Sequence, residues 1–161
     1  MAEVIELVDT KDSSLIGAIG EVAAWKFLGR RRILAHRIGQ WYPFPANYPF
    51  SRGELSYDLS GLSTEQVDYL RRMCSHGPRR YDFVGQKIKR LPDGIHGLVD
   101  ENYLVEVKTT GPGIRRHDWQ GSMKRKIPED VEAAKALGFK VLLIKVNLLD
   151  GWKCEVTSRE L

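Results

Sequence analysis

The sequence predicts an α/β domain in which a mixed β-sheet is flanked by helices. Apolar residues recur at helical spacing in three segments, near 14–28, 63–74 and 128–137. Runs rich in β-forming residues predict strands at 32–37, 80–89, 103–110, 140–149 and 152–157. Helices interleaved with strands in this order are typical of an α/β fold.

Composition sets the first limits on function. The 161 residues suit one domain, 1–161, with its own core. No apolar run is long enough to span a bilayer, and the N-terminus lacks the basic start and apolar block of a signal peptide. We therefore expect a cytoplasmic protein with no membrane partner. The two cysteines, Cys74 and Cys154, are far apart in the sequence and do not form a disulfide framework.

The chain is basic, with a net charge of +4 and a pI near 9.1, which favours a polyanionic partner. Short clusters of Arg and Lys recur along it, and these either form solvated faces or converge on one phosphate-binding surface. The clusters lie at 30–32, 71–72, 79–80, 87–90, 115–116 and 124–126.

The first helix is expected to run from Ser13 or Ser14 to about Leu28, with Gly29 just past its end. Its predicted buried face shares helical spacing and comprises Leu15, Ala18, Ile19, Val22 and Trp25, and the apolar surface is extended to one side by Ile16, Ala23 and Phe27. Glu21 lies at the edge of this apolar stripe. A carboxylate there is partly desolvated, so Glu21 either has a functional partner or pairs with solvent or a basic side chain.

The segment 39–79 differs from the rest and is interpreted as an insertion between the first two core strands. Aromatic and proline residues alternate in its first part, which indicates an ordered loop, an interface or a stacking platform for bases. Ser63 and Gln66 then form a capping-box pattern, so a helix is expected from there to about Cys74.

The strand at 80–89 is expected to carry Asp82 and Val84 on one face and Tyr81 and Phe83 on the other. Turn signals follow at 91–94 and again at 100–102. We therefore expect this strand and the next one to form a β-hairpin or meander.

The strand at 103–110 is the most informative stretch of the chain. Alternation places Tyr103, Val105 and Val107 on one face, and Glu106 and Lys108 beside Leu104 on the other. An acid and a base side by side form either an ion pair at a sheet edge or a catalytic element. In a catalytic element, the carboxylate holds a hard cation and the ammonium steadies a water or a developing negative charge.

The last part of the chain completes the predicted sheet. A basic loop follows Gly111-Pro112-Gly113, and Pro128 suits the first turn of a helix that ends near Gly138. The apolar run 140–149 is typical of a central strand, and Asp150-Gly151 predicts a turn into a final strand paired back on it.

Glu21, Asp82, Glu106 and Lys108 together resemble the PD-(D/E)XK nuclease superfamily, which has the restriction-endonuclease-like fold. Glu106-Val107-Lys108 matches the E-x-K element of that family, and Asp82 matches the acid on its preceding strand. Glu21 is similar to the first-helix glutamate of archaeal Holliday junction resolvases and their relatives. Tyr81 stands where the name of the superfamily has a proline.

This resemblance implies a Mg²⁺- or Mn²⁺-dependent deoxyribonuclease. A structure-specific endonuclease is one kind of deoxyribonuclease that it allows. Asp82 and Glu106 are expected to share the cation with the carbonyl of Val107, and Glu21 to bind a second cation or a metal-bound water. Lys108 is expected to position the attacking water or stabilise charge on the phosphate. The residues expected to contact DNA follow the strand and are Arg115, Arg116, Gln120, Lys124 and Lys126.

Two other functions stay open. The same fold can serve as a nucleic-acid-binding module without catalysis, because fold does not determine function. A third interpretation is a partner-binding domain that uses the aromatic and proline-rich loop. Resolvase-like proteins often dimerise, so a homodimer is an open alternative to a monomer.

Overall fold

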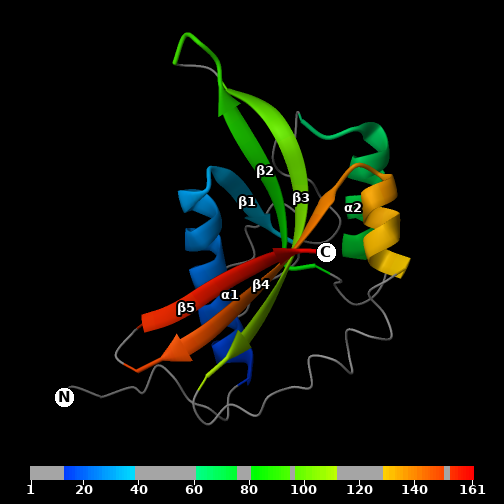
Figure 1. The fold of residues 1–161 in the computed structure, drawn as a ribbon. Helices are drawn as coiled ribbons and strands as arrows, with labels where there is room; N and C mark the ends of the chain where they lie inside the picture. The colour runs from blue at the N-terminus through cyan, green and yellow to red at the C-terminus, as the bar shows by residue number, and fades with distance from the viewer. Residues whose placement is uncertain (1–12, 39–60, 76–80, 95–96, 112–128, 151–152) are drawn as a thin grey trace, which may run out of the picture.

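The computed structural model describes residues 13–38, 61–75, 81–94, 97–111, 129–150 and 153–161. Five strands form one sheet in the order β1-β2-β3-β4-β5 (Figure 1). These are β1 (Ile33–Arg37), β2 (Phe83–Arg90), β3 (Gly97–Thr110), β4 (Lys140–Leu149) and β5 (Lys153–Glu160). Of the described strand pairs, only β3 and β4 are parallel, so the sheet is mixed, as the sequence predicts.

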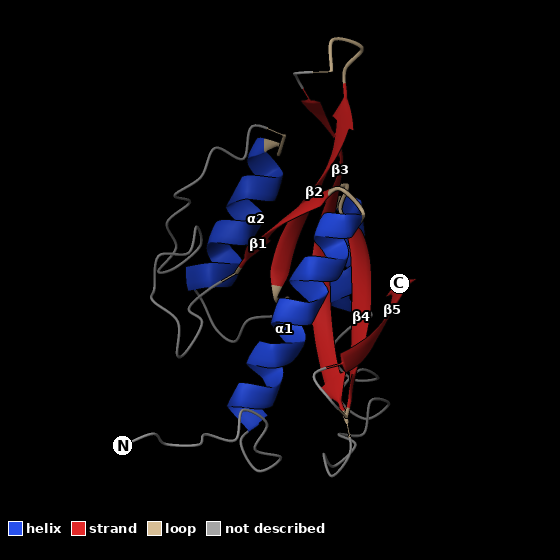
Figure 2. Ribbon diagram, turned by 90° about the vertical axis from the view of Figure 1, so that its left-hand side faces the viewer, coloured by secondary structure: helices blue, strands red, loops and turns tan. Residues whose placement is uncertain are grey.

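Helices cover both faces of this sheet. Helix α1 (Ser13–Arg30) lies on one face, and α2 (Thr64–Ser75) lies on the other together with a helical stretch at 129–136 (Figures 1 and 2). The general α/β class is therefore confirmed. Among the described helices, none is long and apolar enough to cross a membrane.

Two apolar cores result, one on each face of the sheet. The α1-side core is built on Ile16, Ala24 and Leu28, which pack on Val105 and Ile144. The core on the α2 side joins Leu70 and Met73 of α2, Val131 and Ala134 of the 129–136 helix, and Leu104, Val84 and Val141 of the sheet. The alternation predicted for β3 is confirmed, because Tyr103, Val105 and Val107 lie in the first core and Leu104 lies in the second.

The buried face of α1 agrees with the prediction in part, since Ile16, Ala23 and Phe27 pack in or against the core. Val22 and Trp25 are 42% and 55% exposed, whereas Gly20 and Ala24 are buried. A Cβ atom at Gly20 would overlap the side chain of Thr109 on β3. The glycine therefore lets α1 approach the strand closely, and the side of the helix with Gly20, Ala24 and Leu28 faces the sheet, while Val22 and Trp25 are turned outward.

The predicted capping box at the start of α2 is confirmed. The backbone N–H of Ser63 donates to Gln66 Oε1 at 2.9 Å, and the backbone N–H of Gln66 donates to Ser63 Oγ at 3.2 Å. Gln66 also donates from Nε2 to the carbonyl of Leu137 at 2.9 Å. One buried side chain thus caps α2 and ties it to the turn after the 129–136 helix.

β2 and β3 form the predicted hairpin, and its tip extends beyond the helices in Figure 1. Its turn contains Gly94 with φ of 71°, and the Gly94 N–H donates to Leu91 at 2.9 Å. The second predicted turn, at 100–102, is wrong. These residues belong to β3, where Glu101 pairs with Lys87 and Asn102 with Gln86 across the hairpin, so their polar side chains find partners within the sheet.

Candidate functional site

Asp82 lies at a bend immediately before β2, not inside a strand. The side chains on either side of it belong to opposite cores: Tyr81 packs in the α2-side core and Phe83 in the α1-side core. The prediction that Tyr81 and Phe83 share one face is therefore wrong, because the bend interrupts the alternation.

The carboxylate of Asp82 reaches across to β3. Its Oδ2 atom accepts a hydrogen bond from the backbone N–H of Val107 at 2.7 Å, while its own N–H donates to the carbonyl of Val105 at 2.8 Å. A side-chain oxygen thus takes the place that a backbone carbonyl would have in a continued ladder. The bond holds the Asp82 carboxylate at the backbone N–H of Val107, between Glu106 and Lys108 in the sequence.

Glu106 and Lys108 lie on the face of β3 that is turned away from α1. The Lys108 ammonium contacts Glu106 Oε1, and the two side chains are 37% and 17% exposed, respectively. β3 is the middle strand of the sheet. The ion pair of the structural interpretation is therefore present, but it lies within one central strand and not across two strands at a sheet edge.

The Val107 carbonyl is the third ligand that the sequence predicts for a cation at this point. In a β-strand the N–H and C=O of one residue point to the same side, so the Val107 carbonyl is directed to the edge of β3 where Asp82 lies. Among the described residues, no three His, Cys, Asp or Glu side chains gather closely enough to hold a metal ion. Two carboxylates, one carbonyl and water are the donor types that Mg²⁺ prefers, and the binding of a cation by Asp82, Glu106 and Val107 stays a prediction.

Glu21 is held by a different partner. Its carboxylate Oε2 accepts from Nε of Arg37, and both residues are buried, at 8% and 4% exposed. Arg37 ends β1, and its register partner is Phe83, which adjoins Asp82. Glu21 thus approaches the sheet from the α1 side, whereas Glu106 and Lys108 lie on the opposite face, and the proposed role of Glu21 in cation binding stays a prediction.

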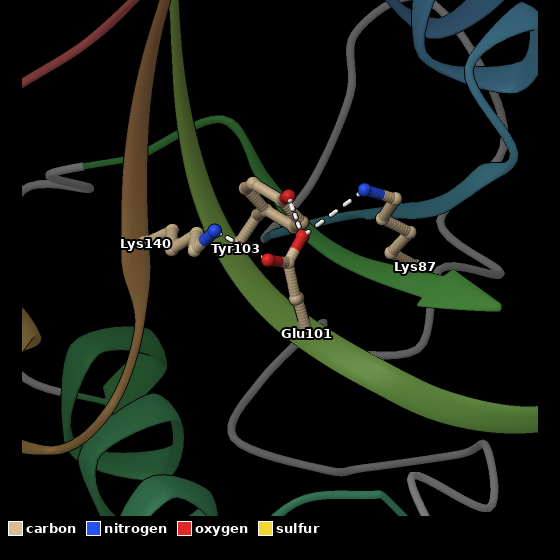
Figure 3. Close-up of polar contacts among 4 residues, drawn as sticks. All are labelled: Lys87, Glu101, Tyr103 and Lys140. Carbon is tan, nitrogen blue, oxygen red and sulfur yellow. Dashed lines mark hydrogen bonds and ion pairs between the residues drawn. The ribbon is translucent and has the colours of Figure 1, made fainter. Parts of the chain in front are cut away.

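A second polar cluster surrounds Glu101 (Figure 3). Its carboxylate accepts from Lys140 on β4, from the Tyr103 hydroxyl on its own strand, and from Lys87 on β2 at 3.3 Å. Lys140, followed by Tyr103, lowers the pKa of Glu101 to about 2. Burial and the bond to Glu101 raise the pKa of the Tyr103 hydroxyl above its usual range. This cluster links three strands and each of its charges has a partner, so we assign it to stability.

Sequence reasoning missed Arg37 and Glu101. The signal for Arg37 was present, because Ile33, Ala35 and Arg37 share one face of a strand by parity. A buried arginine requires a carboxylate, and Glu21 was the desolvated acid without an assigned partner.

The residues predicted to contact DNA, which are Arg115, Arg116, Gln120, Lys124 and Lys126, lie outside the described residues, as do 39–60 and 76–79 of the predicted insertion. Comparison of the chain with protein-family models, with curated proteins and with solved structures found no match.

Proposed function

We propose that the protein is a metal-dependent nuclease that hydrolyses phosphodiester bonds in DNA. The observation that carries the proposal is the bond from the Val107 N–H to the Asp82 carboxylate, which brings an acid from the start of β2 to the centre of the Glu106-Val107-Lys108 element. The fold supports it in a further way. A mixed sheet with one helix before its first strand and another between two parallel strands is compatible with the restriction-endonuclease-like fold.

Each residue of the site has a distinct task. Asp82, Glu106 and the Val107 carbonyl hold Mg²⁺, which when bound supplies Lewis acidity and a water of lowered pKa. Lys108 places a positive charge beside Glu106, where it can orient the attacking water or stabilise the charge that grows on the phosphate. The hydrogen bond from Val107 fixes the Asp82 carboxylate before substrate binds, so that little reorganisation remains for the reaction.

A cleavage assay with the full chain tests this function. Linear, nicked, single-stranded, flapped and four-way DNA are incubated with Mg²⁺, with Mn²⁺ or with EDTA. We expect cleavage of at least one form that requires the cation, and its loss in Glu106→Gln and Lys108→Met.

The chain supplies matched controls for these two variants. Glu101→Gln changes an ion-paired glutamate on the same strand, and Lys87→Met changes its ammonium partner, both in the strand-linking cluster and not in the site. Cleavage should persist in both controls. If the wild type binds DNA in the presence of the cation but never cleaves any form, the protein is a binding module and the proposed catalytic role is wrong.

A further inference from the structure

Two of the basic clusters in the sequence come together at one end of the sheet. α1 ends at Arg30, and the turn that follows it consists of Arg31 and Arg32. β2 ends about sixty residues later in the chain with Lys89 and Arg90. The N–H of Ile88 donates to the Arg32 carbonyl at 3.2 Å, which joins the two segments. We call these five residues the basic end.

The positive charges of the basic end are not neutralised within the part of the chain that the structure describes. All five side chains are exposed, and none of them forms an ion pair with a described carboxylate. By contrast, Lys87 lies two residues before Lys89 on β2 and is neutralised by an ion pair with Glu101. The guanidinium of Arg31 lies 3.5 Å from the centre of the Phe27 ring, so it is held against the surface with its edge free to donate.

Stabilisation of α1 accounts for only part of this charge. Cations after the last turn of a helix are favourable because the helix dipole is negative there, which applies to Arg30, Arg31 and Arg32. It does not apply to Lys89 and Arg90, which stand on a strand. A shared anionic partner accounts for both segments.

A shallow hollow lies between the two segments, and its lining includes residues of the basic end. Its volume is about 340 Å³, and Arg32 and Arg90 stand among its lining residues. The remaining lining is apolar and consists of Gly29, Ile33, Leu34 and Ile88. Leu34 is 53% exposed there. A sugar–phosphate backbone offers the same alternation, with an apolar sugar between charged phosphates.

We infer that the basic end anchors the phosphate backbone of duplex DNA at a distance from the bond that is cut. Asp82 and Arg90 are separated by the length of β2, which is roughly 26 Å for 8 residues at about 3.3 Å per residue. That length corresponds to about eight base pairs at 3.4 Å per step. The inference rests on the proposed function for its substrate, and it assigns that substrate a duplex arm of at least this length.

The test measures binding without cleavage. A fluorescent duplex of about 20 base pairs is titrated with the full chain in EDTA, over a series of salt concentrations, following the counterion-release relation. The variant is Arg32→Gly with Arg90→Ala. Arg32 has φ of 61°, a conformation that glycine adopts without strain, so the change removes the guanidinium without endangering the turn. The control, Lys153→Ala with Arg159→Ala, removes two exposed charges from β5.

We expect the double variant to weaken binding by roughly fivefold for each lost phosphate contact near 0.15 M salt, and to reduce the log–log salt slope by about 0.9 for each contact. The control should stay near the wild-type affinity. Equal affinities of variant and control would overturn the inference, and so would a wild type that binds no duplex or that binds anionic phosphatidylserine vesicles in place of it. Binding and cleavage are measured separately. If the wild type never cleaves DNA but the double variant binds it more weakly, the nuclease function is contradicted and the anchoring site is supported.

Discussion

The Oδ2 atom of Asp82 lies 2.7 Å from the backbone nitrogen of Val107. The contact completes the pairing of β2 with β3, and under the proposed function the same carboxylate has a second task as a cation ligand. Although Asp82 lies at a bend, its carboxylate is held by a bond to a strand.

Substitutions at Asp82 should separate the two tasks. Asp82→Asn keeps an oxygen that accepts from Val107, so we expect it to cost about 1 kcal/mol of unfolding free energy while cation-dependent cleavage is lost. Asp82→Ala leaves the Val107 N–H without its partner and should cost about 1–3 kcal/mol. Urea unfolding and the cleavage assay measure the two effects. Full cleavage by Asp82→Asn would show that this carboxylate holds no cation.

The buried pair of Glu21 and Arg37 should contribute strongly to the integrity of the fold. Glu21→Gln removes the carboxylate that pairs with the buried Arg37 guanidinium, which is expected to cost about 3–5 kcal/mol in urea unfolding. The exposed pair of Lys135 and Glu132 is the comparison, and Lys135→Ala should change stability by less than about 1 kcal/mol.

The same Glu21→Gln variant also tests the predicted role of Glu21 at the cation. If Glu21 is a ligand, the Mg²⁺ concentration for half-maximal cleavage should rise in the folded fraction. An unchanged Mg²⁺ requirement, together with the loss of stability, would assign Glu21 to the fold alone.

Two glycines of α1 should respond to alanine in opposite directions. Gly17 has no atom within 4 Å of a built Cβ, so Gly17→Ala should stabilise the helix by about 0.5–1 kcal/mol. Gly20→Ala would force α1 away from Thr109, and we expect a loss of about 1–3 kcal/mol. Thermal or urea unfolding of the two variants measures this. A Gly20→Ala protein as stable as the wild type would contradict the close approach of α1 to β3.

The cluster around Glu101 should make stability depend on pH in the acid range. Its pKa of about 2 is below the ordinary value of 4.5, so the folded state favours the ionised form. This contribution is complete above about pH 4.5 and is lost as the pH falls from there toward 2. Glu101→Gln should therefore flatten the decline in unfolding midpoint over that range, and an identical decline in the variant would contradict the shift.

The elements that sequence reasoning predicted well are those determined by local patterns. The apolar run of β4, the capping box of Ser63 and Gln66, and the alternation along β3 depend on neighbouring residues, and all three are found in the structure. For the same reason the mixed α/β class could be predicted from the order of the elements.

The errors arise where a distant contact overrides a local pattern. Trp25 was expected in the core because it is large and apolar, but the fit of Gly20 on Thr109 turns it outward. Glu101 and its neighbours appeared to form a turn because they are polar, but Lys87 and Lys140 satisfy Glu101 within the sheet. The geometry at Asp82 depends on a hydrogen bond to a residue 25 positions away, which alternation does not reveal.

The bond from Gln66 to the Leu137 carbonyl has a consequence for deletion of the segment between β1 and β2. Although that segment was interpreted as an insertion, Leu70 and Met73 of α2 are buried against the sheet and the 129–136 helix. A shortened chain that joins β1 directly to β2 would expose Leu104 and Val131 to water. The domain cannot be trimmed to a smaller core at this point, and any shortening of the segment must stop before α2.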